Sequence, residues 1–179
     1  DVIKMDSQEI NKFIKENVDK IYDEMVKVRR TIHENPELGD EEFETSKLIK
    51  RFLTENGIEF FEIINTGVVA TIYNDKENME NKTVATRADI DALPIFEEND
   101  VDYKSKNTGK MHACGHDAHT TIQLGVAKVL AENKDKWHGT ARFFFQPAEE
   151  TSGGSDRMIK AGALKFEKEK DRKIDAFFA

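Results

Sequence analysis

The first third of the chain has the hydrophobic spacing of amphipathic helices. Apolar residues recur there at steps of three and four, which is the period of a helix with one apolar face. These residues are Ile10, Ile14, Val18, Ile21, Met25, Val28 and Ile32. The polar run Asp6–Glu9 before them has the composition of a helix N-cap. A second helix is predicted from about Glu41 to Glu55, ending at Asn56-Gly57 in a left-handed cap. We therefore expect two N-terminal helices within about residues 7–55.

From about residue 58 the pattern changes to short β-branched or aromatic runs bounded by turn residues, which is typical of strands. The predicted strands are Glu59–Ile64, Val68–Tyr73, Thr83–Ala88 and Thr140–Gln146, and the predicted helices among them are Ala118–Glu132 and Ser155–Leu164. This alternation predicts an α/β layered domain with a parallel or mixed sheet over about residues 58–179. The terminal run Ile174–Ala179 is also strand-like and apolar. Because an uncovered strand of this kind favours aggregation, we expect a truncated chain.

Composition and charge narrow the possible partners. The 179 residues include 38% hydrophobic residues, enough for one domain with a full core. Lys and Arg total 27 against 35 Asp and Glu, a net charge of −8 without a basic patch, so nucleic acid is not an expected partner. No apolar run approaches the roughly 20 residues that span a bilayer, so we expect no membrane association. A single cysteine, Cys114, and no signal-peptide pattern favour the cytoplasm.

The densest chemical signal lies in residues 111–119, just before a predicted helix. This segment holds the only cysteine and three of the five histidines: His112, Cys114, His116 and His119. Thiolate and imidazole are ligands of Zn²⁺ and similar ions, and Gly115 allows the backbone to bend so that both neighbours reach one centre. The alternative is a structural cysteine among histidines at the start of a helix. The density of the cluster favours the metal site over this alternative.

Two further segments bring carboxylates to the ends of predicted strands. Glu149 and Glu150 follow an apolar strand and a proline, where one acid could ligate metal and the other handle a proton. Asp89 and Asp91 follow another strand, and either could bind metal or hold a ligand histidine in its tautomer. Taken singly, each pair could be a solvated charge pair or ordinary turn chemistry. The functional interpretation depends on all three segments ending strands of one sheet.

Five collinear motifs together resemble a known family. They are Arg29-Arg30-x-x-His33-x-x-Pro36-Glu37-Leu38-Gly39, Ala88-Asp89-x-Asp91-Ala92-Leu93-Pro94, Met111 through Thr120, Phe145-Gln146-Pro147-Ala148-Glu149-Glu150, and Met158-Ile159-x-x-Gly162-Ala163-Leu164. In this order they resemble the amidohydrolase branch of the dinuclear metallopeptidases. That branch is similar to aminoacylases and includes N-acyl-amino-acid, hippurate and indoleacetyl-amino-acid amidohydrolases.

The resemblance implies a layered α/β/α metallopeptidase catalytic domain, of which residues 1–179 would be the N-terminal portion. It implies that Cys114, His116 and Glu150 are metal ligands and that Glu149 is the general base. We place Asp91 with Glu149 among the catalytic residues, because it could orient a ligand histidine. Asp89, His112 and His119 are possible additional site residues. Two divalent ions per full-length subunit are implied, Zn²⁺ or Mn²⁺, with Co²⁺ or Ni²⁺ also compatible with the ligands.

The reaction implied is hydrolysis of the amide bond of N-acyl amino acids, or small N-blocked peptides, by a metal-activated water. The family's two remaining histidine ligands, and the lid domain through which its members form homo-oligomers, lie outside this sequence. We therefore expect these 179 residues to be inactive alone. Two alternatives stay open, namely a metal-binding or regulatory module that has lost catalysis, and a hydrolase with Cys114 as nucleophile.

Overall fold

A mixed sheet of five strands, in the order β1-β2-β4-β3-β5, forms the centre of the computed structural model, which describes residues 5–166 and 171–179. The strands are β1 Glu59–Ile63, β2 Gly67–Asn74, β3 Thr83–Asp89, β4 Gly139–Gln146 and β5 Ala176–Phe178. The pairs β1–β2 and β2–β4 are antiparallel, whereas β3 runs parallel to both β4 and β5. The predicted α/β fold with a mixed sheet is confirmed, and the terminal strand forms at the sheet edge.

The helices agree with the predicted ones except at their ends. They are α1 Ser7–Glu34, α2 Phe43–Glu55, α3 His116–Glu132 and α4 Gly154–Lys160. Asp6 and Glu9 form the expected capping box of α1. Helix α3 begins two residues earlier than predicted, directly after Gly115, whose φ of 99° is left-handed. Helix α4 ends before the predicted Leu164 because Gly162 is left-handed and the Ala163 N–H bonds to the Met158 carbonyl, a Schellman cap.

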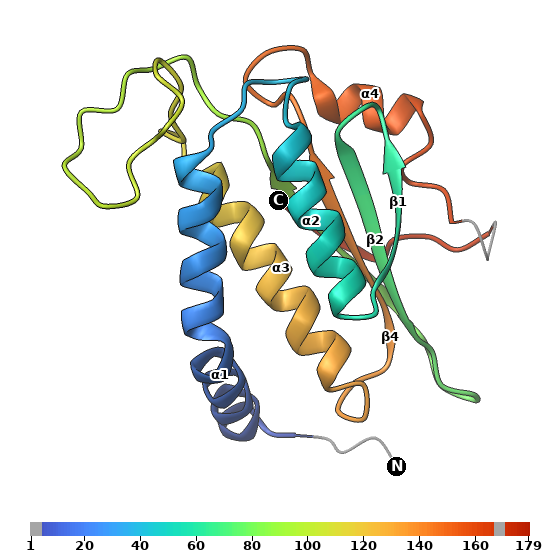
Figure 1. Ribbon diagram of the computed structural model, residues 1–179. Coiled ribbons are helices and arrows are strands. Elements are labelled where there is room, and N and C mark those ends of the chain that lie inside the picture. Colours follow the sequence, from blue (N-terminus) through green and yellow to red (C-terminus); the bar gives the residue numbers. More distant parts are fainter. Residues whose placement is uncertain (1–4, 167–170) are drawn as a thin grey trace.

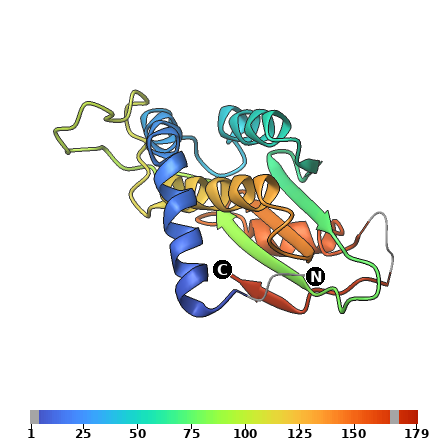
Figure 2. The same cartoon turned by 90° about the horizontal axis from the view of Figure 1, so that it is seen from below.

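Alternate residues of the central strands pack against two different helical layers. Helices α2 and α3 cover one face of the sheet and α1 packs against α3 (Figures 1 and 2), and Val68, Ala70, Phe143 and Phe145 join the core formed with α2 and α3. The residues between them, such as Phe144, face the opposite side and pack with Met158 of α4. The strand period of two thus builds the layered α/β/α arrangement.

The apolar stripes of α1 and α3 do not all face the sheet. Ile14 and Val18 of α1, and Ile122 and Val126 of α3, are 42–64% exposed and line an apolar groove between the two helices. The two helices still approach closely at Gly125, where the missing side chain makes room for Met25. A Cβ at Gly125 would lie only 3.2 Å from the Met25 sulfur. Among the described residues, no helix combines the length and apolar character needed to cross a membrane.

The parallel pair β3–β4 determines where the chemistry gathers. Asp89 and Gln146 are register partners at the carboxyl ends of the two strands, and the N–H of Ile90 donates to the Gln146 carbonyl at 3.0 Å. Helix α3 connects these strands, so its N-terminus returns to the same edge. The segment between β3 and α3, drawn in yellow-green, loops out from the body of the molecule (Figure 1).

Candidate metal centre

The three segments that carry the candidate site residues meet at one edge of the sheet, although they do not all follow strands. Asp89 ends β3, and Glu149 and Glu150 follow β4, as expected. The expectation is wrong for the cysteine-histidine segment, which follows a long loop and opens α3. It nevertheless reaches the site because α3 is the connection between two parallel strands. The Thr120 hydroxyl fixes this contact by donating to the Asp89 carbonyl at 3.0 Å.

His116 is oriented by Asp91. The buried imidazole donates from Nδ1 to the backbone carbonyl of Asp91 at 2.8 Å, and the Asp91 carboxylate lies 3.3 Å from the same nitrogen. Nε2 therefore faces the other carboxylates, at 3.4 Å from Oδ2 of Asp89 and 3.8 Å from Oε1 of Glu150. Burial alone lowers the pKa of His116, but the hydrogen bond with Asp91 and the nearby charges outweigh burial and raise it. One ring nitrogen is thus left for a ligand.

Asp91 also holds the loop that carries the acidic pair. Its Oδ2 accepts a hydrogen bond from the Glu150 N–H at 3.0 Å. Burial by itself raises the pKa of this carboxyl, but hydrogen bonds from His116 and from the N–H groups of Glu150 and Glu149 outweigh it, so the pKa lies below the usual range. Asp91 therefore links α3 to the loop after β4 as a buried carboxylate.

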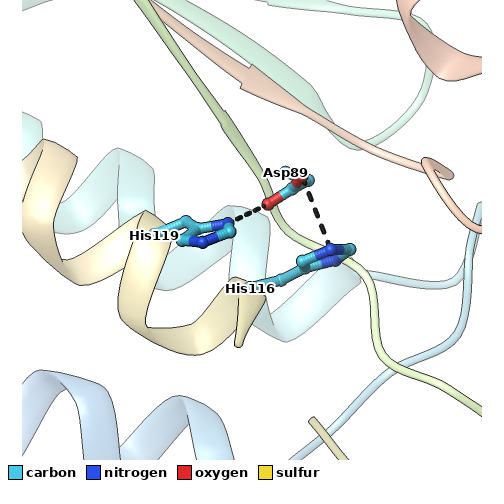
Figure 3. A group of neighbouring side chains, drawn as sticks. All are labelled: Asp89, His116 and His119. Atoms are coloured by element: carbon cyan, nitrogen blue, oxygen red, sulfur yellow. Dashed lines mark hydrogen bonds and ion pairs between the residues drawn. The ribbon is translucent and has the colours of Figure 1, made fainter. Parts of the chain in front are cut away.

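Two groups of side chains in the described ranges have the composition of a metal site, and both use His116. In the first, ligand atoms of Cys114, His116 and Glu150 all lie within 4.8 Å of one another. The second group joins Asp89, His116 and His119 (Figure 3). Because Nδ1 of His116 is engaged by Asp91, the two groups compete for one nitrogen.

The first group is the better ligand set because the carboxylate of the second is already paired. Oδ1 of Asp89 lies 2.7 Å from the imidazole of His119, and Oδ2 lies 2.8 Å from the Arg87 guanidinium. An ion bound there would have to displace a cation from Asp89. Cys114 is exposed, by contrast, and its thiol lies beside the Glu150 carboxylate.

The surroundings of Cys114 make it a poor nucleophile in the metal-free protein. Burial, a hydrogen bond to Glu150 and the charges of Glu150, Asp89 and Glu149 all raise the pKa of the thiol. Activated cysteines lie in electropositive surroundings that lower the pKa, so this environment is the opposite. A cation among the same carboxylates would reverse the effect and favour the thiolate.

His112 lies outside both groups. It is buried, and neither ring nitrogen has a hydrogen-bond partner in the described part of the chain. Burial is the largest of the causes that lower its pKa, to about 4, and its ring centroid lies 6.5 Å from that of His33. Of the three possible additional residues, Asp89 and His119 therefore lie in a candidate ligand group and His112 does not.

A buried ionic network, which the residue patterns did not predict, lies behind the site. Nδ1 of His33 lies 2.7 Å from Asp117, and Nε2 lies 3.0 Å from Glu97. Arg29, one turn earlier in α1, contacts the same oxygen of Asp117 at 2.7 Å. The network ties α1 to the first turn of α3 and to the long loop. The i, i+4 spacing of Arg29 and His33 on a helix was the available signal.

The mixed sheet has helical layers, and thiol, imidazole and carboxylate groups gather at the carboxyl ends of its parallel strands. This arrangement is typical of an α/β domain of the metallohydrolase type. The family described as peptidase family M20/M25/M40 matches residues 85–179, just over half of the chain. The chain belongs to this family, and the resemblance drawn from its motifs is confirmed.

Similar proteins agree with this assignment. The chain is 51% identical over 147 residues to IAA-amino acid hydrolase ILR1-like 2 of Arabidopsis thaliana, covering 82% of this chain and 33% of that protein. It is 48% identical over 155 residues to thermostable carboxypeptidase 2 of Saccharolobus solfataricus, covering 84% and 39%. The structure of Bacillus subtilis YXEP, described as a dinuclear metal binding peptidase, superposes with a TM-score of 0.78 at 40% identity, covering 89% of this chain and 42% of that one. The chain thus spans about a third to two fifths of these relatives.

Proposed function

We propose that the full-length protein is a metal-dependent hydrolase that cleaves the amide bond of N-acyl amino acids or small N-blocked peptides. The observation that carries this proposal is the meeting of Cys114 and His116 with Glu150, which has Glu149 as its neighbour on the loop after β4. The names of the relatives support the substrate class, because one is a hydrolase of amino-acid conjugates and another a carboxypeptidase.

The residues present fit a divalent ion. Cys114, His116 and Glu150 supply one sulfur, one nitrogen and one oxygen, a set that suits Zn²⁺ and is compatible with Mn²⁺, Co²⁺ or Ni²⁺. When bound, such an ion lowers the pKa of a coordinated water and polarises the acyl carbonyl. Because the two groups share one nitrogen of His116, they cannot each hold an ion of the expected pair at the same time.

Glu149 is the proposed general base. Its side chain is exposed and belongs to neither ligand group, while its charge acts on the Cys114 thiol. A carboxylate oxygen of Glu149 takes a proton from the attacking water and returns it to the nitrogen of the leaving amino acid. The products are a carboxylic acid and a free amino acid.

The test of this proposal is metal removal from the full-length protein. Chelation should abolish hydrolysis of N-acetyl and N-benzoyl amino acids, and restoring Zn²⁺, Mn²⁺, Co²⁺ or Ni²⁺ one at a time should recover it, because the base alone has no activated water. Release of the free amino acid is measured against ion content. Stoichiometric metal binding without hydrolysis of any of these substrates would favour the binding-module alternative.

Asp91→Ala should lower both activity and metal affinity by about 10–100-fold, because the ligand histidine and the Glu150 loop lose a common partner. Turnover and metal titration of the full-length variant measure the two effects. Asp91→Asn is the matched variant, because its side-chain oxygen still accepts from the Glu150 N–H. An unchanged metal affinity in Asp91→Ala would remove Asp91 from the site.

Cytoplasmic location and homo-oligomeric assembly remain predictions.

A further inference from the structure

The loop that carries the acidic pair contains, near its start, a residue in a costly backbone conformation. Ala148, directly before Glu149, is completely buried and has a φ of 52°, in the left-handed region that residues with a Cβ seldom occupy. Such a conformation persists only where the surroundings impose it. The Ala148 carbonyl is engaged by the N–H of Gly154 at 3.2 Å. The contact on its N–H comes from much earlier in the chain.

Glu42, the residue before α2, provides that contact. Its side chain is completely buried, with Oε1 accepting from the Ala148 N–H at 2.8 Å and Oε2 accepting from the Thr66 hydroxyl at 2.7 Å. Burial is the largest influence on its pKa and raises it, while these hydrogen bonds act in the opposite direction. Burying a carboxylate is unfavourable, so a contribution to loop geometry explains this position better than a contribution to stability does.

The residues just before Glu42 press on the same loop. A Cβ at Gly39 would lie 3.0 Å from the Ala148 Cα and 2.3 Å from the Thr151 hydroxyl, so the two segments are in direct contact. Asp40 accepts from both terminal nitrogens of Arg157 in α4, at 2.8 and 2.7 Å. Residues 39–42 therefore contact the loop after β4 near its start and bind the helix that follows this loop.

The loop is consequently fixed on both sides of Glu149. Glu42 binds the N–H of Ala148, and Asp91 binds the N–H of Glu150. We propose that Glu42 is a positioning residue for Glu149, holding the left-handed turn that directs the base and the neighbouring ligand Glu150 toward Cys114 and His116. This inference rests on the proposed function, because it assigns a purpose to the geometry of that site.

The experiment compares Glu42→Met and Glu42→Gln in the full-length protein. Methionine keeps the length and removes both acceptors. Glutamine keeps an oxygen for the Ala148 N–H while its amide donates to Thr66. We expect Glu42→Met to lower kcat by about 10–100-fold with KM and metal stoichiometry near wild type, since a small misplacement of a catalytic group costs that much. Glu42→Gln should restore most of the activity.

Two controls separate positioning from general stability. Thr66→Val removes the other partner of Glu42 and should leave kcat near wild type. Glu37 lies close by in sequence, and in the described part of the chain the hydrogen bonds of its carboxylate come from Glu44 and Thr45 of α2, which makes Glu37→Gln the second control. It should lower the melting temperature without lowering kcat per bound metal. Equal losses of kcat in Glu37→Gln and Glu42→Met would overturn the proposal.

A double-mutant cycle and a spectroscopic measurement complete the test. If Glu42 acts through the base, Glu42→Met should cost little further activity once Glu149→Gln is present. Co²⁺-loaded Glu42→Met should show an altered visible spectrum, because Glu150 moves with the loop. If Glu42→Met fails to fold, Gly39→Ala is the second variant, because its Cβ would lie 3.0 Å from the Ala148 Cα and displace that residue, and it should also lower kcat. Wild-type activity that falls in Glu149→Gln but not in Glu42→Met or Gly39→Ala refutes the positioning role alone. An inactive wild type with normal metal content refutes the proposed function instead.

Discussion

Replacing Glu149 by glutamine in the full-length protein should lower kcat by about 10²–10⁴-fold and leave metal content near that of the wild type. Glutamine preserves the size and shape of the side chain but cannot accept the proton of the attacking water. Glu149 belongs to neither metal-ligand group in the described residues, so the metal should stay bound. Metal analysis and turnover, measured on the same preparation, test both parts of this expectation.

The adjacent residue supplies the matched control. Glu150→Gln removes a ligand oxygen one position away, so it should lower metal content, and its activity should recover in part at high metal concentration. The two variants have the same chemistry and the same loop, and they differ only in the assigned role. Unchanged turnover in Glu149→Gln, or metal loss in both variants to the same degree, would contradict the division of roles between the two carboxylates.

Cys114→Ala should release the metal, with an affinity loss of more than about 100-fold, because removing a direct ligand exceeds the 10–100-fold effect typical of residues behind the ligands. Activity should fall in parallel and return in part when the ion is supplied in excess. His119→Ala distinguishes the two ligand groups, because His119 belongs only to the group whose Asp89 is already paired with Arg87. Metal loss in His119→Ala with retention in Cys114→Ala would reverse the assignment.

Alkylation of Cys114 gives a second readout of the same prediction. Since burial and the surrounding carboxylates raise the pKa of this thiol, little reactive thiolate exists near neutral pH in the metal-free protein. Its alkylation by iodoacetamide should be slower than that of free cysteine at pH 7 and should accelerate as the pH rises toward the raised pKa. Bound metal should block the reaction. Fast alkylation that inactivates the metal-loaded protein without releasing the ion would instead support a cysteine nucleophile.

Local periodicity predicted the elements well because it reports the local backbone. The spacing of apolar residues found α1 and α2, and the short β-branched runs found all four strands before the terminal one. It could not tell which face of each helix would be covered. Ile122 and Val126 keep helical spacing in α3, yet they line a groove with α1, while the completely buried positions of α3 include Thr120 and Leu124. Which stripe is covered depends on the neighbouring helix, and spacing within one helix carries no information about it.

By itself the sequence determined the family, through motifs whose residue types are specific, and it named Cys114, His116, Glu149 and Glu150 as the chemistry to test. Only the tertiary structure decided how these residues are held. The contact between Glu42 and Ala148 joins positions 106 residues apart, and that between Asp91 and Glu150 joins positions 59 apart. Such contacts depend on the parallel register of β3 with β4 and on the path of the chain over the sheet. No local pattern encodes them, because neither partner is near the other until the sheet has formed.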